Sequence, residues 1–204
     1  MSVPQYEGHP IHPTEAEPRL APLATDGMRP EWLLTLSHIP GAGLKGAGFP
    51  HHVLGELMYN PETFGPFIEY WITCKSKMSL SVREQELVIL RMACLYRSNY
   101  VWKHHLPVGR EFGIDDREFL AIARRDYSAF AARVQALLTF TDEFVEKRTL
   151  EAATWAQHRS ALAAQDVVDL ISLVSQYVLF ALANNVLQVQ VESPLASVPG
   201  IEAF

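Results

Sequence analysis

The stretch Ser81–Gly113, SVREQELVILRMACLYRSNYVWKHHLPVGREFG, decides the fold of this chain. Its apolar residues recur with helical spacing, once before Ser98 and again after it. Ser81 and Glu84 have the spacing of a capping box for the first helix, and Gly113 is a typical end for the second. The stretch therefore predicts two consecutive helices that can pack as a hairpin.

Each of these helices carries a polar residue on a face that is otherwise mostly apolar. At about 100° per residue, Glu86 shares its face with Ile89 and Ala93. His105 shares its face with Val101. A buried carboxylate costs free energy unless it is paired or protonated. In a hairpin the carboxylate and the imidazole can meet directly or through a water, so we interpret Glu86 and His105 as an acid/base pair.

A structural hydrogen bond between the two residues is the competing interpretation. A salt bridge would also explain Glu86, with Arg83 or Arg91 as its partner. His104 points about 100° away from His105 on the helix. The sequence leaves open whether His104 or Arg91 contributes to the site. No metal site is predicted, because no HxxxH, HxH or carboxylate cluster is present.

Helical spacing continues through most of the remaining chain without strand-like alternation, so we predict an all-α fold. Further helices are expected over residues 51–59, 61–76, 115–123, 130–148, 149–163 and 165–187. Pro66 should interrupt one of them, and Pro107 should kink the helix that carries the histidine. Ser128 or a neighbour should open the helix that follows it, and Thr149 should cap the next.

The segment 165–187 is apolar on almost all sides, although Asp169, Gln176 and Asn184 lie within it. These polar residues favour a buried core or subunit-interface helix over a transmembrane span. Residues 1–30 are rich in Pro and are predicted to form an arm, and residues 31–204 a single helical domain. The segment GAGLKGAG at 41–48 is read as a turn, since it lacks the context of a phosphate loop.

Composition excludes several classes of function. A net charge of −6 argues against a nucleic-acid partner, which would require a basic patch. Cys74 and Cys94 have no CxxC spacing, so we expect no disulfide framework and a cytoplasmic location. The N-terminal residues have no basic region followed by an apolar core, so no secretory signal is expected.

The opening stretch resembles the carboxymuconolactone decarboxylase / alkylhydroperoxidase D-like family. Glu86 opens the family's E-x-x-I-L-R pattern, and His105 follows nineteen residues later. Ser98 and Val101 fall where redox-active members carry their C-x-x-C thiols. The resemblance runs from about residue 51 to 192 and implies the family's helical bundle. In its last part Trp155, Asp166, Tyr177 and Asn185 match the longer members.

The missing thiols make peroxidase or disulfide-reductase activity disfavoured, because that chemistry needs a thiolate. The chain is more similar to the decarboxylase branch, although such members often have Glu where this chain has Val101. The resemblance implies a cofactor-independent, decarboxylase-like lyase that acts on a small cyclic or unsaturated organic acid. It implies His105 and Glu86 as catalytic residues. The residues expected around the substrate are Ser98, Tyr100, Val101 and Trp102.

Two alternatives stay open from the sequence. One is an isomerase or cyclase in an aromatic-degradation or natural-product pathway, which would use the same acid/base pair. The other is a non-catalytic helical oligomer that binds a small ligand. The family resemblance implies a homo-oligomer, either a trimer or a hexamer, and a dimer is also compatible with the apolar segment 165–187. No cofactor, nucleic acid or membrane partner is expected.

Overall fold

The computed structural model describes residues 17–23, 29–30 and 52–192. Within these ranges the regular structure is helical and contains no strand, which confirms the predicted all-α fold. The helices are α2 (His52–Leu57), α3 (Pro61–Lys77), α4 (Val82–Tyr96), α5 (Asn99–Glu111), α6 (Asp116–Arg124), α7 (Ala132–Glu146), α8 (Ala152–His158), the 3₁₀ turn η2 (Arg159–Ala161) and α9 (Ala164–Leu187). Most of the predicted arm and the segment 41–48 lie outside the described residues.

Helix α4 lies at the centre of the bundle. It packs against α5, α6, α7 and α9. Ten consecutive side chains, from Gln85 to Cys94, are buried. A helix surrounded on all sides needs apolar residues around its whole circumference, which is the pattern that the sequence shows. A carboxylate within the segment from Gln85 to Cys94 is therefore necessarily buried.

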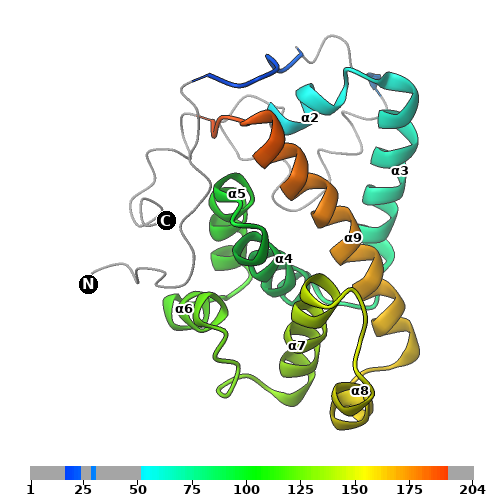
Figure 1. Cartoon of the computed structure of the whole chain (residues 1–204), viewed down its shortest axis with the longest axis vertical. Helices are drawn as coiled ribbons and strands as arrows, with labels where there is room; N and C mark the ends of the chain where they lie inside the picture. The colour runs from blue at the N-terminus through cyan, green and yellow to red at the C-terminus, as the bar shows by residue number, and fades with distance from the viewer. Residues whose placement is uncertain (1–16, 24–28, 31–51, 193–204) are drawn as a thin grey trace.

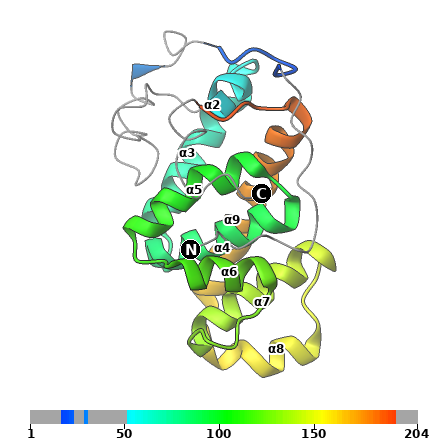
Figure 2. The ribbon, with the colours of Figure 1, turned by 90° about the vertical axis from the view of Figure 1, so that its left-hand side faces the viewer.

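The remaining helices extend the bundle away from this centre. Helices α2 and α8 lie at opposite ends of the molecule, and α9 crosses the bundle between them (Figure 1). The view at right angles shows the same separation, with α5 and α6 on the side that faces the reader (Figure 2). Helix α9 contacts α2, α3, α4, α5 and α7, so its side chains can interact with residues on several other helices.

Local sequence signals set most of the helix ends. The capping box of Ser81 and Glu84 is present at the start of α4, as predicted. Ser98 caps α5, with its hydroxyl accepting a hydrogen bond from the backbone of Val101. Beyond the other end of α5, Gly113 has a φ of 79°. Glycine adopts this left-handed conformation without steric cost, so it suits the end of a helix.

Two prolines lie inside helices without ending them, and the kink expected at Pro107 stays a prediction. Pro66 lies inside α3, which is continuous over 17 residues. One missing hydrogen bond is outweighed there by the burial of Phe64, Ile68 and Trp71. Pro107 likewise lies inside α5, which continues to Glu111.

Two predicted capping residues do not cap a helix. Helix α7 begins at Ala132 because the Ser128 hydroxyl bonds to Asp126 in a turn instead of capping the helix. Thr149 does not cap α8, which begins at Ala152 after Glu151. The backbone N–H of Glu151 donates to the Glu143 carboxylate at 2.9 Å, and this contact fixes the chain just before the helix.

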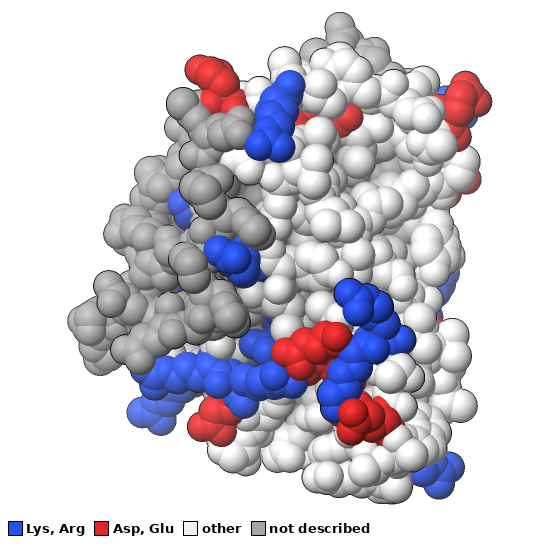
Figure 3. Space-filling model, in the orientation of Figure 1, with Lys and Arg blue, Asp and Glu red and all other residues white. Residues whose placement is uncertain are grey.

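Helix α9 buries one face and leaves an apolar stripe on the other. By length and composition it is apolar enough to cross a membrane, but it packs along the bundle and 44% of its most apolar window is buried. The exposed stripe consists of Val168, Ile171, Leu179, Leu182 and Val186. Figure 3 shows that much of the surface where α9 crosses carries no charged side chain. A subunit interface on this stripe stays a prediction.

Candidate active site

The α4–α5 hairpin brings Glu86 and His105 into direct contact. The chain reverses at Arg97, whose φ of 54° is left-handed, and α5 then starts after Ser98. The Nδ1 atom of His105 lies 2.6 Å from the Oε2 atom of Glu86. Glu86 is completely buried, whereas the His105 side chain is 19% exposed. The predicted pair therefore exists, and only its imidazole reaches the surface of the site.

The cation next to Glu86 is Lys75, which the sequence analysis did not identify. Its Nζ atom lies 3.2 Å from Glu86 Oε1, and its side chain is only 6% exposed. The two arginines proposed as partners bind elsewhere: Arg83 pairs with Glu118 and Arg91 with Asp142. The local sequence gave little sign of this contact, because Lys75 is one of two lysines in the last turn of α3.

Glu86 is held in its charged form. Desolvation by burial raises the pKa of Glu86. The positive charges and hydrogen bonds of His105 and Lys75 lower it by a larger amount, so the pKa lies below its usual value. Because an ionised carboxylate can only accept, the proton of the short hydrogen bond lies on His105 Nδ1. The opposite ring nitrogen, Nε2, takes no part in this bond.

Tyr177 of α9 meets that nitrogen. Its hydroxyl lies 3.2 Å from His105 Nε2, and the two rings are 5.3 Å apart in an edge-to-face arrangement. Burial, together with the charge of Glu86, raises the pKa of Tyr177 well above its usual value, so it acts as a neutral donor. We call the row Lys75–Glu86–His105–Tyr177 the proton chain.

An aromatic wall lies beside the proton chain. Phe180 makes edge-to-face contacts with Phe67 and Trp71, with ring centroids 5.3 Å apart in both pairs. It also contacts Tyr177 at 5.6 Å. The buried Nε1–H of Trp71 makes no hydrogen bond of normal geometry among the described residues, although it lies near enough to the Tyr177 hydroxyl to lower the pKa of that group slightly. A poorly satisfied donor next to an acid/base pair is available to a substrate oxygen.

The predicted substrate residues lie in two different places. Ser98 and Val101 are buried at the start of α5, where they form the helix cap. Trp102 packs edge-to-face on Phe119, at 6.3 Å between ring centroids. Tyr100 belongs to another polar cluster. Ser98 bonds to the backbone of Val101, and Tyr100 bonds to the backbone of Val53 and to Glu192. Contact with a substrate stays a prediction for all four residues.

This other cluster is centred on Glu192, just after α9. Its carboxylate accepts hydrogen bonds from Tyr100 at 2.7 Å and from the backbone N–H of His52 at 2.6 Å. His104 Nε2 lies 2.5 Å from the same carboxylate, and its ring stacks on Tyr100. Burial lowers the pKa of His104, although Glu192 opposes that shift. His104 therefore anchors the segment after α9 and does not join the proton chain.

The Glu192 cluster should make stability depend on pH in acid. Desolvation raises the pKa of Glu192, but hydrogen bonds from His104, His52 and Tyr100 outweigh it and lower the pKa to about 2. A carboxyl with a depressed pKa contributes its stabilisation above the unfolded value and loses it as the pH falls through the folded value. Glu192→Gln should therefore cost about 1–3 kcal/mol at pH 7 and much less near pH 3.

Urea denaturation of both proteins at pH 7, 5 and 3, followed by circular dichroism, measures this difference. Glu111→Gln, at an exposed position of α5, is the matched control and should show no such trend. A stability difference that is the same at pH 3 and pH 7 would show that the cluster does not hold an ionised Glu192.

The cysteines do not form a redox centre. Cys94 is buried, and desolvation raises its pKa to about 12, so it carries almost no thiolate. Cys74 is free and half-buried. Across residues 52–192 and the described part of the N-terminal region, no group of three or more His, Cys, Asp or Glu side chains is placed to hold a metal ion.

Comparisons with known proteins agree with this architecture. Residues 61–143 match the model of the carboxymuconolactone decarboxylase family. A variant of the debrominase Bmp8, solved in complex with 2,3,4-tribromopyrrole, superposes with a TM-score of 0.72 at 11% identity, covering 89% of this chain and 96% of its own. An uncharacterized peroxidase-related protein from Ralstonia eutropha JMP134, described as an alkylhydroperoxidase AhpD core, has a TM-score of 0.72 at 16% identity, with 92% and 96% covered.

A further peroxidase-related protein, from Silicibacter sp. TM1040, has a TM-score of 0.69 at 16% identity, with 94% of this chain and 98% of that chain covered. At these identities the structures share the fold and no more. No curated protein matches the sequence.

Proposed function

We propose that this protein is a cofactor-independent lyase of the decarboxylase type, because residues 61–143 match the model of the carboxymuconolactone decarboxylase family. Its substrate would be a small cyclic or unsaturated organic acid. The proton chain is the observation that carries the proposal: a buried carboxylate, fixed by Lys75, bonds one nitrogen of His105 and leaves the other for proton transfer.

The geometry supports His105 as the group that moves the proton. When the bond between a substrate carbon and its carboxylate breaks, carbon dioxide leaves and the electron pair remains as an enolate. A protonated His105 can deliver its Nε2 proton to that carbon, while Glu86 stabilises the imidazolium before and during transfer. Tyr177 and Trp71 present O–H and N–H donors for the enolate oxygen.

Charge in the site favours an acid as the substrate. The charges of Lys75 and Glu86 cancel, so a protonated His105 leaves the site with one positive charge. An anion is attracted to a partly buried positive site more strongly than it would be in water. The aromatic wall of Phe67, Trp71 and Phe180 offers flat surfaces to a ring or a conjugated chain.

Thiol-based peroxidase chemistry has no support in this chain, although two structural neighbours are described as peroxidase-related. Ser98 and Val101 occupy the positions of the family's redox thiols, and the Cys94 thiol stays protonated. The debrominase neighbour shares the fold at 11% identity, so its reaction is not carried over.

Incubation in deuterium oxide with a panel of cyclic β-keto acids and unsaturated lactone acids tests the proposal. A decarboxylase should release carbon dioxide and yield a product with deuterium on the carbon that lost its carboxylate, detected by mass spectrometry. Deuterium incorporation without carbon dioxide would identify the isomerase or cyclase alternative. If neither occurs and a small molecule co-purifies unchanged, the protein is a ligand-binding oligomer and the enzyme proposal is wrong.

A further inference from the structure

A second groove lies between α9 and the segment that follows α7. Its volume is about 630 Å³, within the range of small-molecule sites. Its walls come from α4, α7, α9 and residues 148–150. No member of the proton chain lines it. A ligand here would therefore occupy a site separate from the proposed active site.

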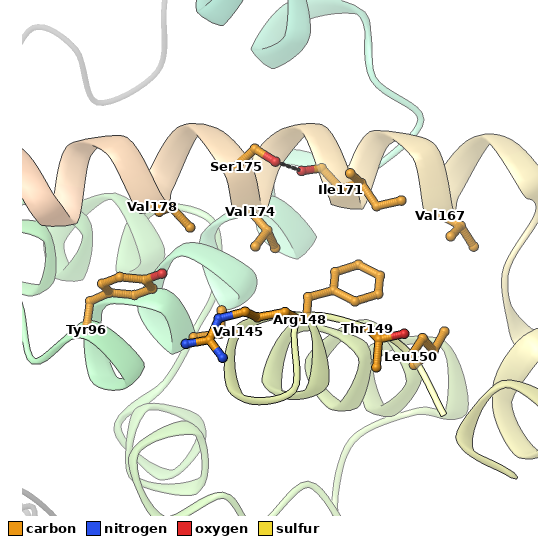
Figure 4. Close-up of a pocket in the computed structure, with 11 residues that line it drawn as sticks. Tyr96, Val145, Arg148, Thr149, Leu150, Val167, Ile171, Val174, Ser175 and Val178 are labelled. Atoms are coloured by element: carbon orange, nitrogen blue, oxygen red, sulfur yellow. Dashed lines mark hydrogen bonds between the residues drawn. The ribbon is translucent and has the colours of Figure 1, made fainter. Parts of the chain in front are cut away.

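The two ends of this groove differ in chemistry. Figure 4 shows Tyr96 and Arg148 at one end, with the Arg148 guanidinium directed toward the tyrosine. Leu150 and Val167 lie at the other end, and Ile171 lies between the ends on α9. No acidic residue lines the groove. Tyr96 and Arg148 thus form a polar end, which we call the head site because it could bind the polar head group of a ligand. The rest of the groove is mainly apolar.

Arg148 is the cation of the head site. It is exposed, it has a left-handed φ of 59°, and it takes part in no ion pair among the described residues. Burial raises the pKa of Tyr96 while the Arg148 charge opposes this, so Tyr96 keeps its hydroxyl proton. Helices α4 and α7 both end here, and their C-terminal carbonyls disfavour an anion. Any attraction for an anion must therefore come from Arg148.

We propose that this groove binds a medium-chain carboxylate in free form. Its carboxylate would bond to Arg148 and to the Tyr96 hydroxyl, and its alkyl chain would cover Val167, Ile171 and Leu150. A charge-assisted hydrogen bond fixes the head, and burial of apolar surface holds the chain. The proposal is independent of the proposed reaction, because it uses none of the same residues.

Isothermal titration calorimetry with decanoate and decanol, below the concentrations at which they form micelles, separates the two parts of the site. The protein should bind decanoate more tightly than decanol. Arg148→Gln should weaken decanoate about tenfold and leave decanol unchanged. Ile171→Trp, at a half-exposed position, fills the groove and should weaken both ligands. Arg124→Gln, at an exposed position of α6, is the control and should change neither.

Three results would overturn the proposal. Equal binding of decanoate and decanol, unaffected by Arg148→Gln, would show that the groove has no head site. Decanoate affinity that falls as the protein concentration rises would show that a second copy of the chain covers the groove. Binding to vesicles of anionic phospholipid, but not to free decanoate, would identify a membrane surface as the occupant.

Discussion

Replacing His105 with Gln should slow the proposed reaction by about 10²–10⁴-fold, the usual contribution of a positioned general acid or base. Glutamine keeps a polar group near Glu86 but cannot accept and release a proton. The rate constant is measured as carbon dioxide release, with deuterium incorporation as a second readout, on the substrate found in the panel. Folding should be preserved, because the His105 side chain is partly exposed at the edge of the core.

His158→Gln, on α8 at the far end of the molecule, is the matched control and should retain full activity. Tyr177→Phe keeps the aromatic ring and removes only the donor to Nε2, so its loss should be smaller than that of His105→Gln. A His105→Gln protein that keeps more than about one tenth of the activity would rule out a proton-transfer role for His105.

Replacing Glu86 with Gln should lower the free energy of unfolding by about 3–5 kcal/mol, because the change leaves the buried Lys75 ammonium without its counter-charge. The pKa of Glu86 is lowered in the folded protein, so its stabilisation is present at neutral pH and disappears as acid protonates it. Urea denaturation at pH 7 measures the loss. When the measurement is repeated at low pH, the free energy of unfolding of the wild type should approach that of the variant.

A second substitution makes this prediction specific to the charge. Lys75→Met removes the unpaired ammonium, so the double variant with Glu86→Gln should recover most of the lost stability. Glu69→Gln, on the exposed side of α3, should have almost no effect. If Glu86→Gln costs less than about 1 kcal/mol, or if Lys75→Met gives no recovery, the pair is not a buried ion pair.

The helices and the Glu86–His105 pair were predictable because their signals are local. Helical spacing and the capping box of Ser81 act within one or two turns, and that capping box is present. Local signals failed where another contact outweighed the predicted one. Pro66 stays inside α3 because its neighbours are buried in the core, and Ser128 bonds within its own turn.

The sequence by itself determined an all-α bundle, a Glu/His pair on consecutive helices and the absence of thiols at Ser98 and Val101. Only the tertiary structure decided which side chains complete the site. Lys75 lies on α3, the helix just before the hairpin, and Tyr177 lies on α9, far from it in sequence; the approach of both depends on how those helices pack. Helix packing also places the Tyr100 hydroxyl within hydrogen-bond distance of Glu192. Spacing along one helix fixes the direction in which a side chain points. It does not fix the partner of that side chain, because the partner lies on another helix.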